Sequence, residues 1–356
     1  MHTHVRRGSM LQLVAPMTAK RFAMAIIMPN TNPPITTARM ARTYRDEILK
    51  TTRCYTWEFE PLMTLYLTDK LNPRSVTELI RGVKYYPRGL TTNSDSGVQN
   101  PASLWTKNTG PHSVLRACAD KGKVLMLHAA DGFAREHAMV DGSTYMPGEE
   151  LDPYHQEPHF IRNTLPRIRE AHPDLKISVE HLSTMSGVNY MREHGGPTLG
   201  CSITAQHLLL DRRDVHRGGL RPHTFWWPII QKKEDRQAIR ELAAGNHDFV
   251  WLGSDSAPHP ISKKETDCCS GGVLTAHAGI ELYAQAFEDM GALDDRFERF
   301  ASINGPNFFN VKPSKQTIGL VRRAWRVESM FITDDGESPT IHPFMLGEEI
   351  RWKLQR

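Results

Sequence analysis

Short apolar runs rich in β-forming residues alternate with longer amphipathic stretches, and this alternation constrains the fold more than any other feature. The apolar runs are His2–Val5, Phe22–Met28, Leu62–Leu67, Gly82–Tyr85, Val124–Leu127, Ile177–Val179, Cys201–Thr204 and Phe249–Leu252. Helical patterns cover Thr37–Leu49, Pro111–Lys121, Pro158–Ala171, Glu234–Ala244 and Thr275–Met290. Repeated βα units imply a parallel sheet with right-handed crossovers. Eight such units predict an α/β fold of the closed (β/α)8 TIM-barrel type.

The length and the absence of a linker predict one main domain. A chain of 356 residues could form one large barrel or two ordinary domains, and no low-complexity tract divides this one. We expect the barrel over residues 1–328 and a C-terminal extension over residues 329–356 that packs against its outside. Residues 131–158 are rich in Gly, Pro and charge and are typical of a long loop over the barrel mouth.

Charge and hydropathy exclude several classes of protein. The formal net charge is only +4 and no Lys/Arg block stands out, so we expect no nucleic-acid surface. No apolar run reaches the roughly 18 residues that a membrane span needs. The cysteines contain no CxxC pair and favour a reduced, cytoplasmic protein; they are Cys54, Cys118, Cys201, Cys268 and Cys269. A transit peptide is the weaker interpretation of the start of the chain, because its removal would discard His2 and His4.

Metal-competent side chains recur at the ends of the predicted strands. His2 and His4 are two residues apart on an extended segment, so their rings point to the same face. Other predicted strands are followed by, or contain near their ends, Lys84, His128, His181 and Asp255. Each has an ordinary explanation by itself: a histidine on the rim, a lysine whose amine reaches solvent, an aspartate that caps a helix. Because strand ends meet at one face of such a barrel, their recurrence favours a shared metal centre.

Lys84 is the unusual member of this set, because a protonated lysine repels metal ions. Partial desolvation near two cations would lower its pKa and free the neutral amine. The amine could then take up carbon dioxide, giving a carbamate whose two oxygens bridge two metals. Such a pair would acidify a shared water to hydroxide, and a neighbouring carboxylate could take its proton and later return it to a leaving nitrogen.

Long ordered strings extend this pattern over nearly the whole chain. They include residues 25–30, 33–37, 61–68, 84–87 and 91–94, followed by residues 180–181, 218–223, 255–259 and 302–306. On these strings the chain resembles the type II, PyrC-like dihydroorotases of the amidohydrolase superfamily. The resemblance implies a metal-dependent hydrolase of cyclic amides that reversibly converts N-carbamoyl-L-aspartate into L-dihydroorotate in pyrimidine biosynthesis.

The resemblance also implies roles for individual residues. It predicts two Zn²⁺ ions bridged by N6-carboxylated Lys84, with His2 and His4 on the first metal and His128 and His181 on the second. Asp255 matches the residue that binds the first metal and acts as general base and acid. The residues that match the family's substrate contacts are Arg6, Asn30, Thr91, Thr92, Trp227, His259 and Gly271. Members of the family are often dimers, so we expect a homodimer.

Two departures from the family leave alternatives open. Relatives have a longer segment before the histidine pair, so the first strand is expected to be short here. Whether His2 and His4 are held in a defined position is therefore an open question. A catalytically silent, dihydroorotase-like scaffold subunit is therefore one alternative. Trp226 and Trp227 stand where smaller residues are usual. A related amidohydrolase acting on another acidic cyclic amide is the other alternative.

Overall fold

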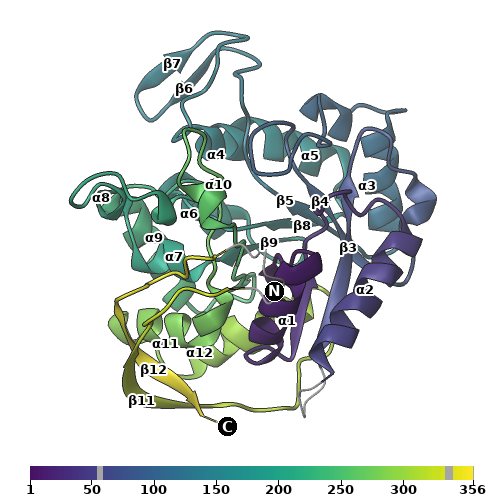
Figure 1. Cartoon of the computed structure of the whole chain (residues 1–356). Coiled ribbons are helices and arrows are strands. Elements are labelled where there is room, and N and C mark those ends of the chain that lie inside the picture. The colour runs from purple at the N-terminus through teal and green to yellow at the C-terminus, as the bar shows by residue number, and fades with distance from the viewer. Residues whose placement is uncertain (54–58, 333–339, 356) are drawn as a thin grey trace.

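A barrel of parallel strands surrounded by helices forms the centre of the protein (Figure 1). The computed structural model describes residues 1–53, 59–332 and 340–355, so Cys54 lies outside the described residues. The strands lie in the order β1 (His2–Thr3), β2 (Met24–Ile27), β3 (Glu60–Leu67), β4 (Ile80–Tyr85), β5 (Val124–Leu127), β8 (Lys176–Val179), β9 (Leu199–Ile203) and β10 (Val250–Leu252). Each predicted apolar run overlaps one of them, and the (β/α)8 architecture is confirmed.

The first strand is short, as predicted, and it nevertheless closes the barrel. On one side His2 and Thr3 pair in parallel with Ile26 and Ile27 of β2. On the other side the backbone N–H of Asp255 donates to His2 O at 2.9 Å, and His4 N–H donates to Ser256 O at 3.0 Å. His2 and His4 are both buried. The short strand is therefore held from both sides.

Helices cover the outside of the barrel. They are α1 (Gly8–Ala19), α2 (Ala38–Thr52), α3 (Gly110–Asp120), α4 (Gln156–His159), α5 (Leu165–Ala171), α6 (Met185–His194), α7 (Ala205–Leu209), α8 (Arg212–Val215), α9 (Lys233–Ala244), α10 (Ile261–Lys264), α11 (Gly279–Asp289), α12 (Asp295–Glu298) and α13 (Asn304–Phe308). In α2, Thr37 caps the first turn by accepting from Met40 N–H, and Ala41, Tyr44 and Ile48 form the buried stripe. The predicted helices are all present, the one over residues 158–171 as α4 and α5 joined by a π-helical turn at Phe160–Thr164, whereas α1 and α6 were not predicted.

The segment over residues 131–158 contains a hairpin and is not only a loop. Strand β6 (Ala138–Val140) pairs antiparallel with β7 (Ser143–Tyr145), and Figure 1 shows the pair projecting from the barrel. Asp141 and Gly142 join the strands with φ values of 48° and 88°. An Asp-Gly pair with positive φ is the turn that matches the twist of a hairpin. The sequence carried this signal.

The C-terminal residues form a second hairpin outside the barrel. Strand β11 (Gly319–Arg326) pairs antiparallel with β12 (Glu349–Gln355). Strand β12 lies against α11, where Arg351 N–H donates to Gln285 Oε1 at 3.0 Å. The two strands lie on opposite sides of the predicted boundary at residue 328, and that division stays a prediction.

Every second side chain of a strand points into the barrel, and inward residues two positions apart lie at successive levels along the barrel axis. The lower level is an apolar plug made of Ile26, Met28, Leu62, Val124, Met126, Trp251, Phe308 and Phe309. On β5, Met126 belongs to this plug, and His128 follows two residues later on the same face. The polar residues therefore lie above an apolar floor. No helix in the described ranges is long and apolar enough to cross a membrane.

Arg21, just beyond α1, and Glu281 of α11 form a buried ion pair with N–O distances of 2.8 and 2.9 Å. Replacing Arg21 by Ala would leave the Glu281 carboxylate buried without its partner. We expect Arg21→Ala to lower the free energy of unfolding by about 3–5 kcal/mol in denaturant titrations. The control is Arg167→Ala, because the Arg167–Glu136 pair is about half exposed at 2.8 Å, and its loss should cost under about 1 kcal/mol. Equal losses in both variants would contradict the prediction.

Candidate active site at the mouth of the barrel

One cavity at the carboxyl ends of the strands collects nearly all of the predicted site residues. Its lining comprises His2, His4, Arg6, Asn30, Lys84, Tyr86, Thr91, Thr92, His128, His181, Trp227, Asp255, Ala257, Gly271 and Gly272. These residues come from loops and strands far apart in sequence. Among the predicted site residues, His259 alone is not part of the lining.

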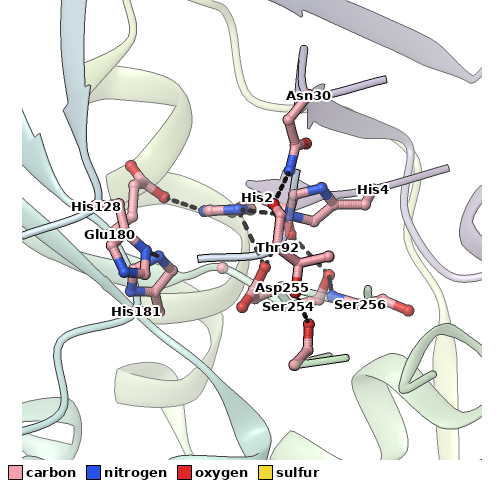
Figure 2. Close-up of polar contacts among 12 residues, drawn as sticks. His2, His4, Asn30, Thr92, His128, Glu180, His181, Ser254, Asp255 and Ser256 are labelled. Carbon is pink, nitrogen blue, oxygen red and sulfur yellow. Dashed lines mark hydrogen bonds and ion pairs between the residues drawn. The ribbon is translucent and has the colours of Figure 1, made fainter. Parts of the chain in front are cut away.

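His2, His4 and Asp255 form the tightest cluster in this cavity (Figure 2). Asp255 Oδ1 lies 3.2 Å from His2 Nε2 and 3.0 Å from His4 Nε2. One ligand atom from each residue falls within 4.8 Å of the others. Two imidazoles and a carboxylate at such distances are a donor set that suits zinc and similar divalent ions.

A second pair of histidines lies beside this cluster, as Figure 2 shows. His128 Nδ1 is 3.2 Å from His181 Nε2. Burial lowers the pKa of His128 to about 3 and that of His4 to about 4, and it holds the pKa of His181 well below its usual range. These rings are therefore neutral near pH 7, and a neutral imidazole has a nitrogen lone pair free for a metal.

Lys84 lies fully buried on β4 and lines the same cavity. Its Nζ has no hydrogen-bond partner among the residues that the structure describes. Burial lowers the pKa of Lys84 to about 8, although Glu180 and Asp255 oppose this shift. A buried polar atom without a partner is costly, so this amine marks a place where another group fits.

Asp255 is ionised in this environment. Burial by itself would raise the pKa of Asp255, but the adjacent His2 and His4 rings outweigh it and hold that pKa well below its usual range. The carboxylate can thus bind a cation or accept a proton at neutral pH.

Glu180 is a site residue to which the sequence analysis gave no role. Its Oε2 lies 2.7 Å from His2 Nδ1 and accepts from Ser202 Oγ at 2.8 Å. Ser178 Oγ donates to the other carboxylate oxygen. A carboxylate on the outer ring nitrogen fixes the tautomer of a histidine and leaves its second nitrogen free for a metal. Glu180 therefore orients His2.

The backbone explains why this contact was hard to foresee. Glu180 and His181 are consecutive, and regular strand geometry would point them to opposite faces. His181 has a φ of 45°, Asp255 of 42° and Arg6 of 58°, all in the left-handed region. Such conformations cost roughly 1–3 kcal/mol each and concentrate at functional sites. They re-aim the side chains at the point where each strand ends.

The remaining predicted residues surround the entrance. Arg6 donates from Nε to Pro258 O at 3.1 Å, and its Nη2 lies 3.0 Å from His259 Nε2. Burial and the charge of Arg6 lower the pKa of His259 to about 2, so this ring is neutral. His259 thus lies outside the cavity lining and contacts the lining residue Arg6. Thr92 Oγ1 donates to Gly271 O at 3.0 Å, which joins two sides of the cavity.

The two tryptophans have different surroundings. Trp227 lines the cavity, whereas Trp226 is buried outside it and donates from Nε1 to His207 Nε2 at 3.2 Å. Of these two large residues, Trp227 is therefore the one expected to change the shape of the cavity. Tyr86 also lines the cavity, and its hydroxyl has no partner within the described part of the chain. Tyr86 received no role from the sequence.

Comparisons with known proteins give a consistent result. The chain is 38% identical over 359 residues to a dihydroorotase of Hahella chejuensis, with 99% of this chain and 96% of the relative covered. It is 39% identical over 360 residues to a dihydroorotase of Aromatoleum aromaticum, with the same coverage. No family model matches the chain.

A solved structure extends the likeness to three dimensions. The crystal structure of dihydroorotase from Saccharomyces cerevisiae in complex with 5-fluoroorotic acid superposes with a TM-score of 0.86 at 29% identity. The match covers 100% of this chain and 96% of that chain. The likeness therefore includes the barrel and the segments around its mouth.

The buried Lys84 amine should make the stability of the metal-free protein depend on pH in carbon dioxide-free buffer. The usual lysine pKa of 10.5 falls to about 8 in the folded state. Below pH 8 the folded state bears the full cost of burying the charge, on the order of 3 kcal/mol. Above about pH 10.5 the amine is neutral in both states, so the cost is gone. We expect Lys84→Met to be the more stable protein at pH 7, with an advantage that shrinks as the pH rises from 8 to 10.5.

Denaturant titrations of both proteins at several pH values measure this difference. Comparing the two at each pH cancels the other groups that titrate in the same range. A stability difference that does not change with pH would contradict the prediction.

Proposed function

The chain belongs to the dihydroorotase family, hydrolases that act on cyclic amide C–N bonds, and on this basis we propose that it interconverts N-carbamoyl-L-aspartate and L-dihydroorotate in de novo pyrimidine biosynthesis. The observation that supports this reaction most is the content of a single cavity. It combines the metal-competent group of His2, His4 and Asp255 with the guanidinium of Arg6 and the amide of Asn30. The substrate needs both a means of activating water and a site for its carboxylate.

The residues present fit a pair of divalent metals. His2, His4 and Asp255 would hold the first ion, and His128 and His181 the second. The buried amine of Lys84, which has no hydrogen-bond partner among the described residues, would carry a carboxyl group shared by the two ions. We propose zinc, although imidazole and carboxylate ligands also accept manganese or cobalt. Such ions, when bound, lower the pKa of a shared water and polarise a carbonyl.

Asp255 is proposed to move the proton. Its carboxylate is ionised and lies against His2 and His4. In the hydrolytic direction Asp255 would take the proton of the attacking water and then give it to the leaving ring nitrogen. In the direction of ring closure the same carboxylate would take the proton from the attacking carbamoyl nitrogen and give it to the oxygen that leaves as water.

Residues at the entrance are proposed to bind the substrate carboxylate and enclose the ring. Arg6 offers a charged fork, and Asn30 and His259 complete the anion site. Thr91 and Thr92 belong to a segment proposed to close over the ring. Trp227 and Gly271 supply a wall of the cavity.

The presence of Trp227 favours a second candidate function, in which the substrate is a related acidic cyclic amide. We further propose a cytoplasmic homodimer.

The first experiment measures hydrolysis of L-dihydroorotate by zinc-supplemented protein, with Lys84→Ala as the comparison. We expect turnover in the wild-type chain, loss of at least about 100-fold in the variant, and loss on chelation that zinc restores. Elemental analysis should find two metal ions per chain before chelation. Absent turnover with two metals bound would indicate a different cyclic amide. Absent turnover without bound metal would contradict the proposed centre.

Arg6→Ala tests the anion site separately from the metal centre. Removing a buried guanidinium from a carboxylate costs about 2–5 kcal/mol of binding, so KM for L-dihydroorotate should rise by at least about 30-fold while metal content stays unchanged. The matched control is Arg7→Ala. Arg7 bonds Glu47 Oε2 from its Nε at 3.2 Å, away from the cavity lining. An unchanged KM in Arg6→Ala would remove the carboxylate-binding role.

A further inference from the structure

The indole of Trp227 occupies the space that a side chain at residue 271 would need. A Cβ built on Gly271 would lie 2.9 Å from Trp227 Nε1 and 3.3 Å from Cγ, and it would come closer still to Cδ1. Contacts under 3.0 Å essentially never occur at a real Cβ, so even alanine would force the ring or the backbone to move. Gly271 is not among the residues with positive φ. Its backbone conformation therefore tolerates a side chain, and the three atoms nearest to the added Cβ all belong to the indole.

The segments that carry these two residues are held together, so the clash has little room to relax. The buried Lys264 donates from Nζ to the carbonyl oxygens of Phe225 at 2.7 Å and of Ser270 and Gly272 at 3.0 Å. Gly272 N–H also donates to Phe225 O at 3.1 Å. The rings of Phe225 and Trp227 contact edge to face, with centroids 5.4 Å apart. Residues 225–227 and 270–272 thus form one braced wall.

This wall belongs to the reactive cavity. Trp227 and Gly271 both line it, together with Lys84 and Asp255. Gly271 also accepts a hydrogen bond from Thr92 through its carbonyl. A change in the position of the indole therefore alters the cavity dimensions beside the groups proposed to act on the substrate.

We propose that Trp227 and Gly271 act as one specificity element, in which the indole limits the size of the ring that the cavity admits and the glycine leaves the space that the indole requires. This inference rests on the proposed function, because it takes the substrate to be a six-membered cyclic amide. It selects an unsubstituted ring over one that carries an additional alkyl group. A pocket wall typically discriminates by about 10- to 200-fold per methylene.

Four variants test the coupling: Gly271→Ala, Trp227→Leu, the double variant of both, and Gly196→Ala. Gly196 is the control, because a Cβ there meets nothing within 4 Å and its φ is not positive. The readouts are kcat and KM for L-dihydroorotate and for its 5-methyl analogue, with thermal unfolding and metal content measured in parallel.

We expect Gly271→Ala to lower kcat/KM for L-dihydroorotate by at least about tenfold in the wild-type background and by less than about threefold in the Trp227→Leu background. Trp227→Leu should raise the preference for the 5-methyl analogue by at least about tenfold relative to wild type. Gly196→Ala should match the wild type in both measurements. The double variant keeps the test valid if Gly271→Ala alone folds poorly.

Two results would overturn the proposal. One is an equal effect of Gly271→Ala with and without the indole. The other is an unchanged preference between the two substrates in Trp227→Leu. Both outcomes require an active wild-type chain, so they differ from failure of the proposed function, in which wild-type protein would not turn over L-dihydroorotate at all.

Discussion

Two backbone hydrogen bonds between the first residues and residues 255–256 hold the site together. Asp255 N–H donates to His2 O, and His4 N–H donates to Ser256 O. They close the barrel, and they also place the His2 and His4 rings against the Asp255 carboxylate. The pairing joins positions some 250 residues apart, so the metal-competent cluster depends on the closure of the barrel and not on the local chain.

Much of this arrangement could be predicted because it depends on periodicity. The apolar runs gave the strands, and the rule that reactive groups gather at the carboxyl ends of barrel strands brought His128 and Lys84 to one place. The Asp141-Gly142 pair is also a sequence signal for a hairpin turn. The Gly-rich, charged composition around it favoured the prediction of a loop instead. Alternation of side chains across a strand is a property of the local chain, so a sequence displays it.

The features that escaped prediction depend on departures from that regularity or on contacts through space. Positive φ at His181 lets it and Glu180 contribute to the same site, which breaks the period of two. Nothing in the residues next to Glu180 indicates that its partner is His2. The different surroundings of Trp226 and Trp227 likewise depend on His207 and Gly271, which are distant in sequence. The resemblance to a known family assigned roles to individual residues. The residues that contact and orient them became known only from the packing of the folded chain.

The apolar plug beneath the site determines from which side substrate can reach the cavity. Trp251, Phe308 and Met126 fill the barrel below the polar level, so the cavity has an apolar floor and an entrance on the side of the loops. The described residues below this level are packed, so we expect substrate to reach the cavity from the loop side, beside Thr92. For the proposed reaction, substrate and product would then compete for the same space next to Asp255, and accumulation of either would slow the conversion of the other.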